Sequence, residues 1–397
     1  MFMRITLRFA IAILLVVLLT PAMTKIEAQN GSSQKDRFVA HEWGTFTSVS
    51  TSDGKAQLWD PLSGPSELPS FVYRSGQCRK GFRGALALVR METPVIYFYS
   101  DRDVRASVKV DFPKGCITEW YPLARTTTQN INWNGFIAQP SAKERFPVDQ
   151  SRSHYYPARE TDAAPLSLGD EQKVEQEKFL FYRGIGFFDL PLSVRLKDDQ
   201  VIVRNLAQDE IAQVILFENR DGKSGWRIHG ALKGEAAIAR PALDPKGATA
   251  AAGSLPREFE KTLVEQGLYE KEAAAMVKTW RDSWFEEGLR VFYIVPRRAT
   301  DAILPITINP APSELARVFV GRAEIITPEM ERDILAAVKQ FNEDSDEARA
   351  AAVNVIRRYG RFADPVLRQA VSGAGKEAAR SRVETLITAA ARPASHR

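Results

Sequence analysis

The chain has 397 residues, and 54 Lys and Arg against 49 Asp and Glu give it a formal net charge of +5. Hydrophobic residues make up 44% and charged residues 26%, which is typical of globular proteins and excludes a wholly disordered chain. Two cysteines exclude a four-cysteine zinc or iron–sulfur site, and four histidines leave little room for a histidine-rich metal centre. The small positive charge does not indicate a nucleic-acid partner. The length suits two or three domains, or one large sandwich with an appendage.

The first segment, residues 1–28, has the pattern of a secretory signal peptide. Two arginines precede an unbroken apolar run from Phe9 to Leu19, which Pro21 ends. The run is shorter than the ~20 residues needed to span a bilayer, and small residues suit cleavage after Ala28. We therefore expect a secreted or periplasmic, soluble mature protein with no membrane-spanning segment later in the chain.

Residues 36–239 predict a β-sandwich region. Short alternating or apolar runs are separated by turn residues, and no long helices alternate with them, which favours antiparallel sheets. Val194 and Leu196 lie across a polar turn from Val201 and Val203, so we expect a hairpin there.

Polar residues dominate the segment 138–178, and we expect a long surface excursion of the kind that often carries binding residues. Residues 240–327 predict a linker, a long amphipathic helix and further strands. Apolar side chains recur at helical spacing from Phe259 to Trp284, with a break at Gly267. The later strands either complete the sandwich or form its second half.

Residues 328–392 predict a helical C-terminal cap. A threonine, a proline and an acid at 327–329 favour a helix N-terminus, and short, closely spaced helices follow. These helices resemble a fragment of a HEAT-type helical repeat. The predicted fold class is mixed and mainly β, with an antiparallel β-sandwich region, a long amphipathic helix and a C-terminal α-helical cap.

Residues 41–47 have the sequence His-Glu-Trp-Gly-Thr-Phe-Thr. This stretch resembles the opening of a family of uncharacterised secreted bacterial proteins, and the segments 93–99, 118–122 and 181–184 fit the same resemblance. The resemblance covers most of the chain except the helical tail. It implies secretion and implies no activity.

Three enzyme motifs are incomplete in this chain. His41 and Glu42 would need a second histidine at position 45 to form a zincin site, but that residue is Thr45. The Gly-Lys-Ser sequence at 222–224 lacks the upstream glycine of a phosphate loop. No Gly-x-Ser-x-Gly elbow is present, which disfavours an α/β-hydrolase.

The candidate catalytic residues are His41, Glu42, Glu119 and His154. Histidine can donate, accept or ligate near neutral pH, and a pair of acids can hydrolyse a glycoside. His41 and His154 are candidate metal ligands only if the fold brings them together. The structural alternative is that His41 and Glu42 merely open the first strand and that His154 is solvated on a loop.

The candidate ligand-binding residues are Trp43, Trp120, Tyr155 and Arg159. Each tryptophan follows a glutamate, and aromatic rings beside carboxylates suit a sugar or another polar ligand. Tyr155 and Arg159 lie in the polar excursion, where binding residues concentrate. The alternative is that the aromatic rings fill a sandwich core.

Cys78 and Cys116 are predicted to form a disulfide, because an exported chain meets an oxidising environment. Two separate buried thiols are the alternative, since cysteine also behaves as a small hydrophobic residue.

These observations favour a binding or structural protein of the cell envelope, because no complete catalytic motif is present. Its expected partner is a polar ligand or an envelope component. A secreted hydrolase, for example one that acts on carbohydrate, and a metal-dependent enzyme are the alternatives. The sequence requires no cofactor and leaves the identity of any cofactor unknown.

Overall fold

A computed structural model describes residues 37–373 apart from 63–67, 77, 79–85, 152, 170–172, 246–253 and 342–344, together with 381, 383 and 385–387. The expected signal segment and most of the last expected helix lie outside the described residues. Part of the expected linker, from residue 246, also lies outside them.

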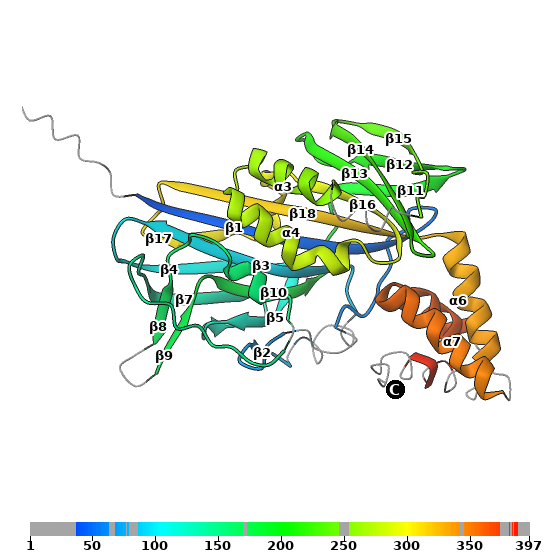
Figure 1. The fold of residues 1–397 in the computed structure, drawn as a ribbon, viewed down its shortest axis with the longest axis horizontal. Coiled ribbons are helices and arrows are strands. Elements are labelled where there is room, and N and C mark those ends of the chain that lie inside the picture. The colour runs from blue at the N-terminus through cyan, green and yellow to red at the C-terminus, as the bar shows by residue number, and fades with distance from the viewer. Residues whose placement is uncertain are drawn as a thin grey trace, which may run out of the picture. The chain divides into compact units, whose positions relative to one another are not determined.

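A nine-stranded sheet forms the centre of the fold (Figure 1). In order across the sheet, its strands are β14 (Lys223–Leu232), β13 (Ile211–Arg220), β16 (Gly288–Val295), β18 (Glu314–Ile326), β1 (Phe38–Thr51), β3 (Val89–Ser100), β10 (Leu180–Gly186), β5 (Gly115–Tyr121) and β2 (Tyr73–Arg74). β1 and β18 are parallel, and all other neighbouring strands are antiparallel. The late strands β16 and β18 therefore lie in the same sheet as the first strand.

Two smaller sheets pack on one face of this central sheet. The six-stranded sheet contains β17 (Ile306–Asn309), β4 (Val104–Asp111), β7 (Asn130–Ala138), β8 (Leu166–Gly169) and β9 (Val174–Glu177), with β6 (Arg125–Thr126) paired to β7. The three-stranded sheet contains β11 (Leu192–Lys197), β12 (Gln200–Asn205) and β15 (Glu235–Ala239). One apolar cluster joins all three sheets, including Phe46, Val108 and Val203. The mainly β, sandwich-like fold predicted from the sequence is thus present.

The hairpin predicted from residue alternation is confirmed. Val194 lies opposite Val203 and Leu196 opposite Val201, between β11 and β12. All but Leu196 are buried in the shared core, and Leu196 packs against it. Every second side chain of a strand points to the same face, so apolar residues that alternate with polar ones all face the core. The local sequence was therefore sufficient to predict this hairpin.

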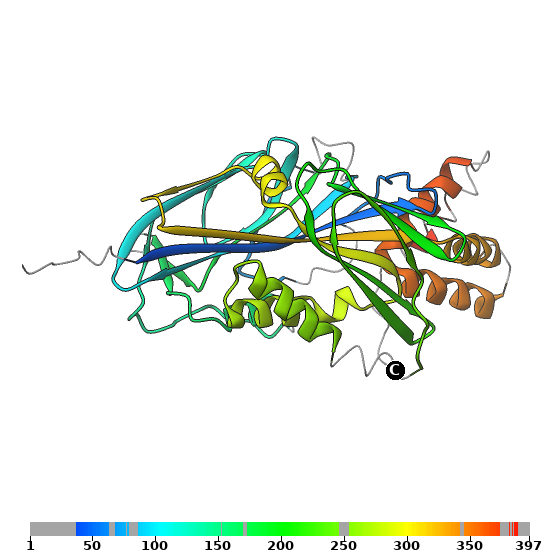
Figure 2. The same cartoon turned by 90° about the horizontal axis from the view of Figure 1, so that it is seen from above.

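Two helices and the short 3-10 turn η2 (Tyr156–Arg159) cover the other face of the central sheet. The helices are α3 (Leu255–Glu265) and α4 (Glu270–Trp284), and their apolar sides share a cluster with Trp43. Figure 2 shows this helix pair, in yellow-green, on one side of β1 and β18 and the cyan strands on the other. In place of one long helix the chain has two, because Gly267 breaks the helix with a φ of +107°.

The C-terminal helices pack against Val49 of β1, Ile326 of β18 and Trp59 in the loop that follows β1. They are α6 (Pro328–Phe341), α7 (Asp346–Tyr359), the 3-10 turn η3 (Gly360–Ala363) and α8 (Asp364–Gly373). Ser345 begins α7, since its hydroxyl accepts a hydrogen bond from the Ala348 N–H at 3.3 Å. No helix in the described part of the chain combines the length and the apolar composition needed to cross a bilayer.

Candidate functional site

His41 and Glu42 project from opposite faces of β1, because successive side chains of a strand alternate. His41 faces α4, where it bonds to Glu272, while Glu42 faces the core between the sheets, where it bonds to Tyr182. Both side chains are fully buried. The structure therefore gives the two adjacent residues separate environments.

The His41 imidazole is held by a buried carboxylate. Its Nδ1 lies 2.8 Å from Glu272 Oε2, and Glu272 also accepts from the Tyr99 hydroxyl at 2.8 Å and the Tyr269 N–H at 2.7 Å. A carboxylate accepts hydrogen bonds, so the Nδ1 of His41 carries the proton. Burial and the charge of Glu272 raise the pKa of Tyr99 far above its ordinary value. The second nitrogen, Nε2, has no hydrogen-bond partner among the described residues and lies 3.7 Å from Glu314 Oε1.

Glu42 forms a buried ion pair with Arg317 of β18. The Arg317 Nε donates to Glu42 at 2.5 Å, and the Tyr182 hydroxyl donates to the other carboxylate oxygen. Arg317 Nη1 donates to Asp301 of α5 (Arg297–Ile303) at 2.7 Å. Burial disfavours the charged guanidinium, but the charge of Glu42 and the hydrogen bonds to Glu42 and Asp301 outweigh burial and raise the pKa of Arg317.

Glu119 and Trp120 do not share a cleft with Glu42. Trp120 belongs to the core between the sheets, and it is paired in register with Tyr182, which contacts Glu42. Glu119 precedes Trp120 on β5 and therefore points to the opposite face. Two strands, β3 and β10, separate β5 from β1. The structure does not bring Glu42 and Glu119 together as a pair of acids.

Arg159 and Tyr155 hold the segment 138–178 together, because both bond to Glu177 of β9 within the same segment. The Nε and Nη2 atoms of Arg159 donate to the two carboxylate oxygens of Glu177, at 2.9 and 2.6 Å. The Tyr155 hydroxyl donates to the same carboxylate at 2.9 Å. The rings of four aromatic residues lie 5.1–5.8 Å from the guanidinium: Phe71, Phe146, Tyr155 and Tyr156. Burial opposes the charge of Arg159, but Glu177 outweighs it and raises the pKa of Arg159. Residues 139–151 are exposed or half-buried, as expected of a surface excursion, whereas β8 and β9 belong to the six-stranded sheet and Tyr155 is buried, which the polar composition did not predict.

Trp43 and His154 differ in burial. Trp43 is fully buried under α4, in the cluster that includes Tyr97 and Phe292. His154 is half-buried in the turn before η2. Within the described ranges, no group of three or more His, Cys, Asp or Glu residues is arranged to hold a metal ion.

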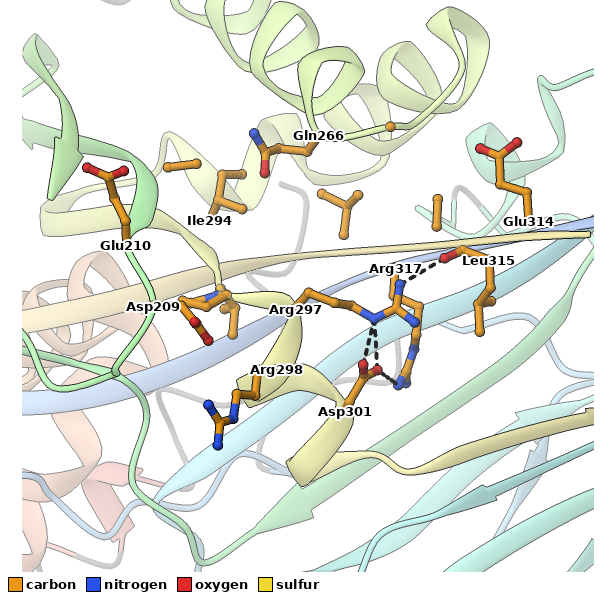
Figure 3. Close-up of a pocket in the computed structure, with 16 residues that line it drawn as sticks. Asp209, Glu210, Gln266, Ile294, Arg297, Arg298, Asp301, Glu314, Leu315 and Arg317 are labelled. Atoms are coloured by element: carbon orange, nitrogen blue, oxygen red, sulfur yellow. Dashed lines mark hydrogen bonds and ion pairs between the residues drawn. The ribbon is translucent and has the colours of Figure 1, made fainter. Parts of the chain in front are cut away.

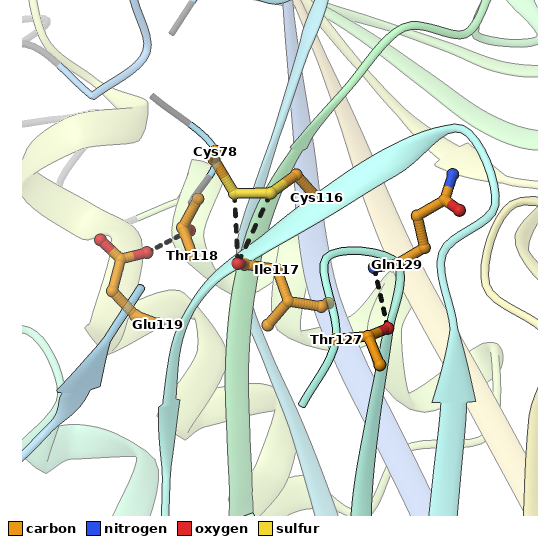
Figure 4. The surroundings of a disulfide bond; sticks show 7 residues. All are labelled: Cys78, Cys116, Ile117, Thr118, Glu119, Thr127 and Gln129. Carbon is orange, nitrogen blue, oxygen red and sulfur yellow. Dashed lines mark hydrogen bonds between the residues drawn. A yellow bond between two sulfur atoms is a disulfide. The ribbon is translucent and has the colours of Figure 1, made fainter. Parts of the chain in front are cut away.

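The predicted disulfide between Cys78 and Cys116 is confirmed (Figure 4). The two Cα atoms are 5.9 Å apart, and both residues are fully buried beside Ile185. The bond joins the chain next to β2 to the neighbouring strand β5. Glu119 lies close by, and its carboxylate accepts from the Thr118 hydroxyl.

A groove of about 750 Å³ lies beside the first residues of β18. Four segments line it: the start of β13, the α3–α4 turn, the end of β16 with α5, and residues 314–318. Figure 3 shows Arg297, Asp301 and Arg317 grouped on one side of it, with Glu210 and Glu314 toward its two ends. Ligand sites commonly have this size, with a few placed polar groups.

Asp301 organises the charged wall of the groove. It accepts from Arg297 Nε at 2.8 Å and from Arg317 Nη1 at 2.7 Å. Arg317 in turn is fixed from behind by Glu42, and the exposed Glu314 lies in front of His41. Glu42 and His41, two of the candidate residues predicted from the sequence, therefore lie behind the groove, beside its lining residues Arg317 and Glu314.

None of the candidate site residues predicted from the sequence lines the groove. Pro296 ends β16 and Arg297 pairs with Asp301 four residues later, which is visible as a short helical pattern after a strand. Nothing local indicates that β18 passes this point, since its pairing with β1 joins residues far apart in the chain.

No protein-family model matches the chain, and no curated protein matches it. Among solved structures, the chain is similar to the yeast delta-COP-I mu-homology domain, alone and complexed with the Dsl1 WxWxV peptide. The TM-scores are 0.30 and 0.29 at 10% and 8% sequence identity, over 73% of this chain and 98% and 99% of those chains. Similarity at this level carries no argument about the fold or the function of this chain.

Proposed function

We propose that the protein is exported and acts in the cell envelope as a binding protein, with its ligand in the groove between α5 and the α3–α4 turn. The signal-peptide pattern of residues 1–28 supports export. The buried disulfide between Cys78 and Cys116 also supports it, because structural disulfides form in oxidising compartments.

One observation carries the binding role: the groove has a charged wall that the core holds in place. The Arg317 side chain has no exposed surface: it lies in the wall behind the groove, where it pairs with Glu42 and its Nη1 holds the half-exposed carboxylate of Asp301, which lines the groove. A ligand therefore meets oriented polar groups whose rotamers are already fixed, so little side-chain entropy is lost on binding. This arrangement favours recognition of a polar ligand.

The same contacts favour binding over catalysis. A general acid or base must lie within hydrogen-bond reach of the reacting group. Both carboxylate oxygens of Glu42 are occupied by Tyr182 and Arg317, and His41 is fully buried. These groups orient the wall of the groove without reaching into it.

Export is tested by the intact mass of the protein recovered outside the cytoplasm. We expect a mature N-terminus between residues 23 and 29, as the apolar run and Pro21 indicate. A recovered chain that still begins at Met1 would contradict cleavage.

Binding in the groove is tested by thermal shift against a panel of amino acids, oligopeptides, sugars and phosphorylated metabolites. Ala212 is exposed and lines the groove, so Ala212→Trp should fill it and abolish the shift given by a true ligand. Ala237 is exposed on β15, outside the groove, so Ala237→Trp is the matched control. This variant should show the same thermal shift with the ligand as the native chain. A ligand that binds both variants equally, or that the protein converts to a product, would overturn the proposal.

A further inference from the structure

The groove exists because one strand of the central sheet stops early. The pairing of β16 with β18 runs from Leu289, opposite Ile325, to Val295, opposite Phe319, and ends there. Pro296 then turns the chain away from the sheet and into α5. Residues 314–318 of β18 continue beyond this point and, within the described ranges, have strand partners on the β1 side alone. The groove follows the vacated edge, with α5 along one side of it and the α3–α4 turn along the other.

The backbone of this edge faces the groove. Arg297 Nη1 donates to the Leu315 carbonyl at 2.8 Å, so this carbonyl points away from β1 and toward α5. The N–H and C=O of one strand residue point to the same side, and those of every second residue do likewise. The N–H of Leu315 and both backbone groups of Arg317 therefore also face the groove, where the described chain gives them no backbone partner.

We propose that the ligand is an extended, basic peptide that adds to the sheet as a strand along residues 314–318 of β18. The inference rests on the proposed binding function and specifies its ligand class. A row of free backbone groups is the recognition element of strand addition, and five residues of strand offer about 17 Å of edge. The peptide takes the place that β16 leaves, and its N–H groups replace the Arg297 side chain at the Leu315 carbonyl.

The charge of the rim selects the basic peptide. Arg297 and Arg317 are neutralised by Asp301 and Glu42, so they offer little net positive charge to a ligand. The exposed carboxylates Asp209 and Glu210 have no ion-pair partner within the described ranges, and Glu314 is 57% exposed. The one remaining arginine of the lining, Arg298, donates to the Gln208 amide. Lysine or arginine side chains of the peptide complement this acidic excess.

Arg297 is placed to guard the open edge against pairing with other chains. A charged side chain on a free edge is a common guard against edge-to-edge association. Arg297 is about half exposed and satisfies a single carbonyl, so a peptide can displace it at small cost. We expect Arg297→Ala to bind the peptide more tightly than the native chain does.

The probe is a blocked peptide of alternating threonine and lysine, measured by fluorescence anisotropy with the mature protein. We expect saturable binding that a threonine–glutamate peptide does not show, and that Ala212→Trp abolishes. Hydrogen exchange of residues 314–318 should slow when the lysine peptide binds, because the edge amides acquire partners. Absence of saturable binding at about 1 mM peptide overturns the inference.

Leu315 supplies a matched pair of variants. Leu315→Pro removes the N–H that faces the groove and spares the β1 side, and proline is tolerated at such an edge position. It should weaken peptide binding by about tenfold or more, whereas Leu315→Ala, which keeps the N–H, should bind within about threefold of the native chain. Equal binding by the two variants overturns strand addition. If Leu315→Pro does not fold, the exchange measurement on the native chain decides.

The peptide inference and the proposed function fail separately. If a member of the ligand panel binds in the groove and the lysine peptide does not, the strand-addition inference is wrong and the binding function stands. If neither binds, both are wrong. Peptide binding that Ala212→Trp leaves unchanged places the peptide elsewhere and overturns the inference.

Discussion

Glu92 of β3 connects the central sheet to the C-terminal helices and gives a quantitative test of their packing. Its Oε1 accepts from Arg361 Nη1 at 2.5 Å, and its Oε2 accepts from the Thr47 hydroxyl at 2.9 Å. Burial alone would raise the pKa of Glu92, but the charges of Arg361, Arg90 and other nearby arginines outweigh burial and lower this pKa to about 2.

We predict that Glu92→Gln lowers the free energy of unfolding by about 3.5 kcal/mol at pH 7. The ordinary pKa of 4.5 exceeds the folded value by about 2.5, and each pH unit corresponds to about 1.4 kcal/mol. Because the folded pKa is depressed, this contribution is complete above about pH 4.5 and is lost as the pH falls toward 2. Urea denaturation at a series of pH values should therefore show the native and Glu92→Gln curves converging near pH 2.

The control for this series is Glu265→Gln. Glu265 is exposed and lies 3.9 Å from the exposed Lys261, so its removal should change the unfolding free energy by less than about 0.5 kcal/mol at any pH. A Glu92→Gln variant as stable as this control at pH 7, or a difference that persists unchanged to pH 2, would refute the reasoning.

Three further predictions concern residues singled out from the sequence. Replacing Cys78 and Cys116 together by serine should cost about 3–4 kcal/mol in urea denaturation, and thiol titration of the unfolded, unreduced native protein should find no free thiol. Arg159→Lys loses the two-pronged contact with Glu177, so limited proteolysis between residues 142 and 165 should accelerate, and unchanged proteolysis would contradict the structural role. His154→Ala should leave the free energy of unfolding within about 0.5 kcal/mol of the native value, and a larger decrease of this free energy in calorimetry would show that His154 has a packing role.

The sequence was sufficient where structure depends on neighbours in the chain. The β11–β12 hairpin follows from alternation, and Gly267 marks the break between α3 and α4. The disulfide followed from the expected compartment and the presence of two cysteines. The hairpin and the helix break depend on residues that are close together in the chain. The disulfide could be predicted because the chain contains only two cysteines, which leave a single possible pair.

The candidate site depended on partners that no local pattern reveals. His41 is held by Glu272, which lies 231 residues later, and Glu42 is held by Arg317, 275 residues later. From the sequence alone, His41 and Glu42 were either reactive groups or residues that merely open the first strand. A polar side chain on a strand has the same local pattern whether it faces solvent or a buried partner from a distant segment, so its availability could not be predicted.

The parallel pairing of β1 with β18 has a consequence for the order in which the protein can form. β1 is the first strand of the described chain, and residues 52–313 separate it from β18. On that edge β1 has no other neighbour in the described part of the chain. Half of its backbone groups therefore lack strand partners until nearly the whole sheet-forming sequence has been synthesised. Contacts between such distant segments slow folding and expose unpaired strands to aggregation in the meantime. We therefore expect any truncation before residue 326 to yield an insoluble chain, however complete its earlier strands are.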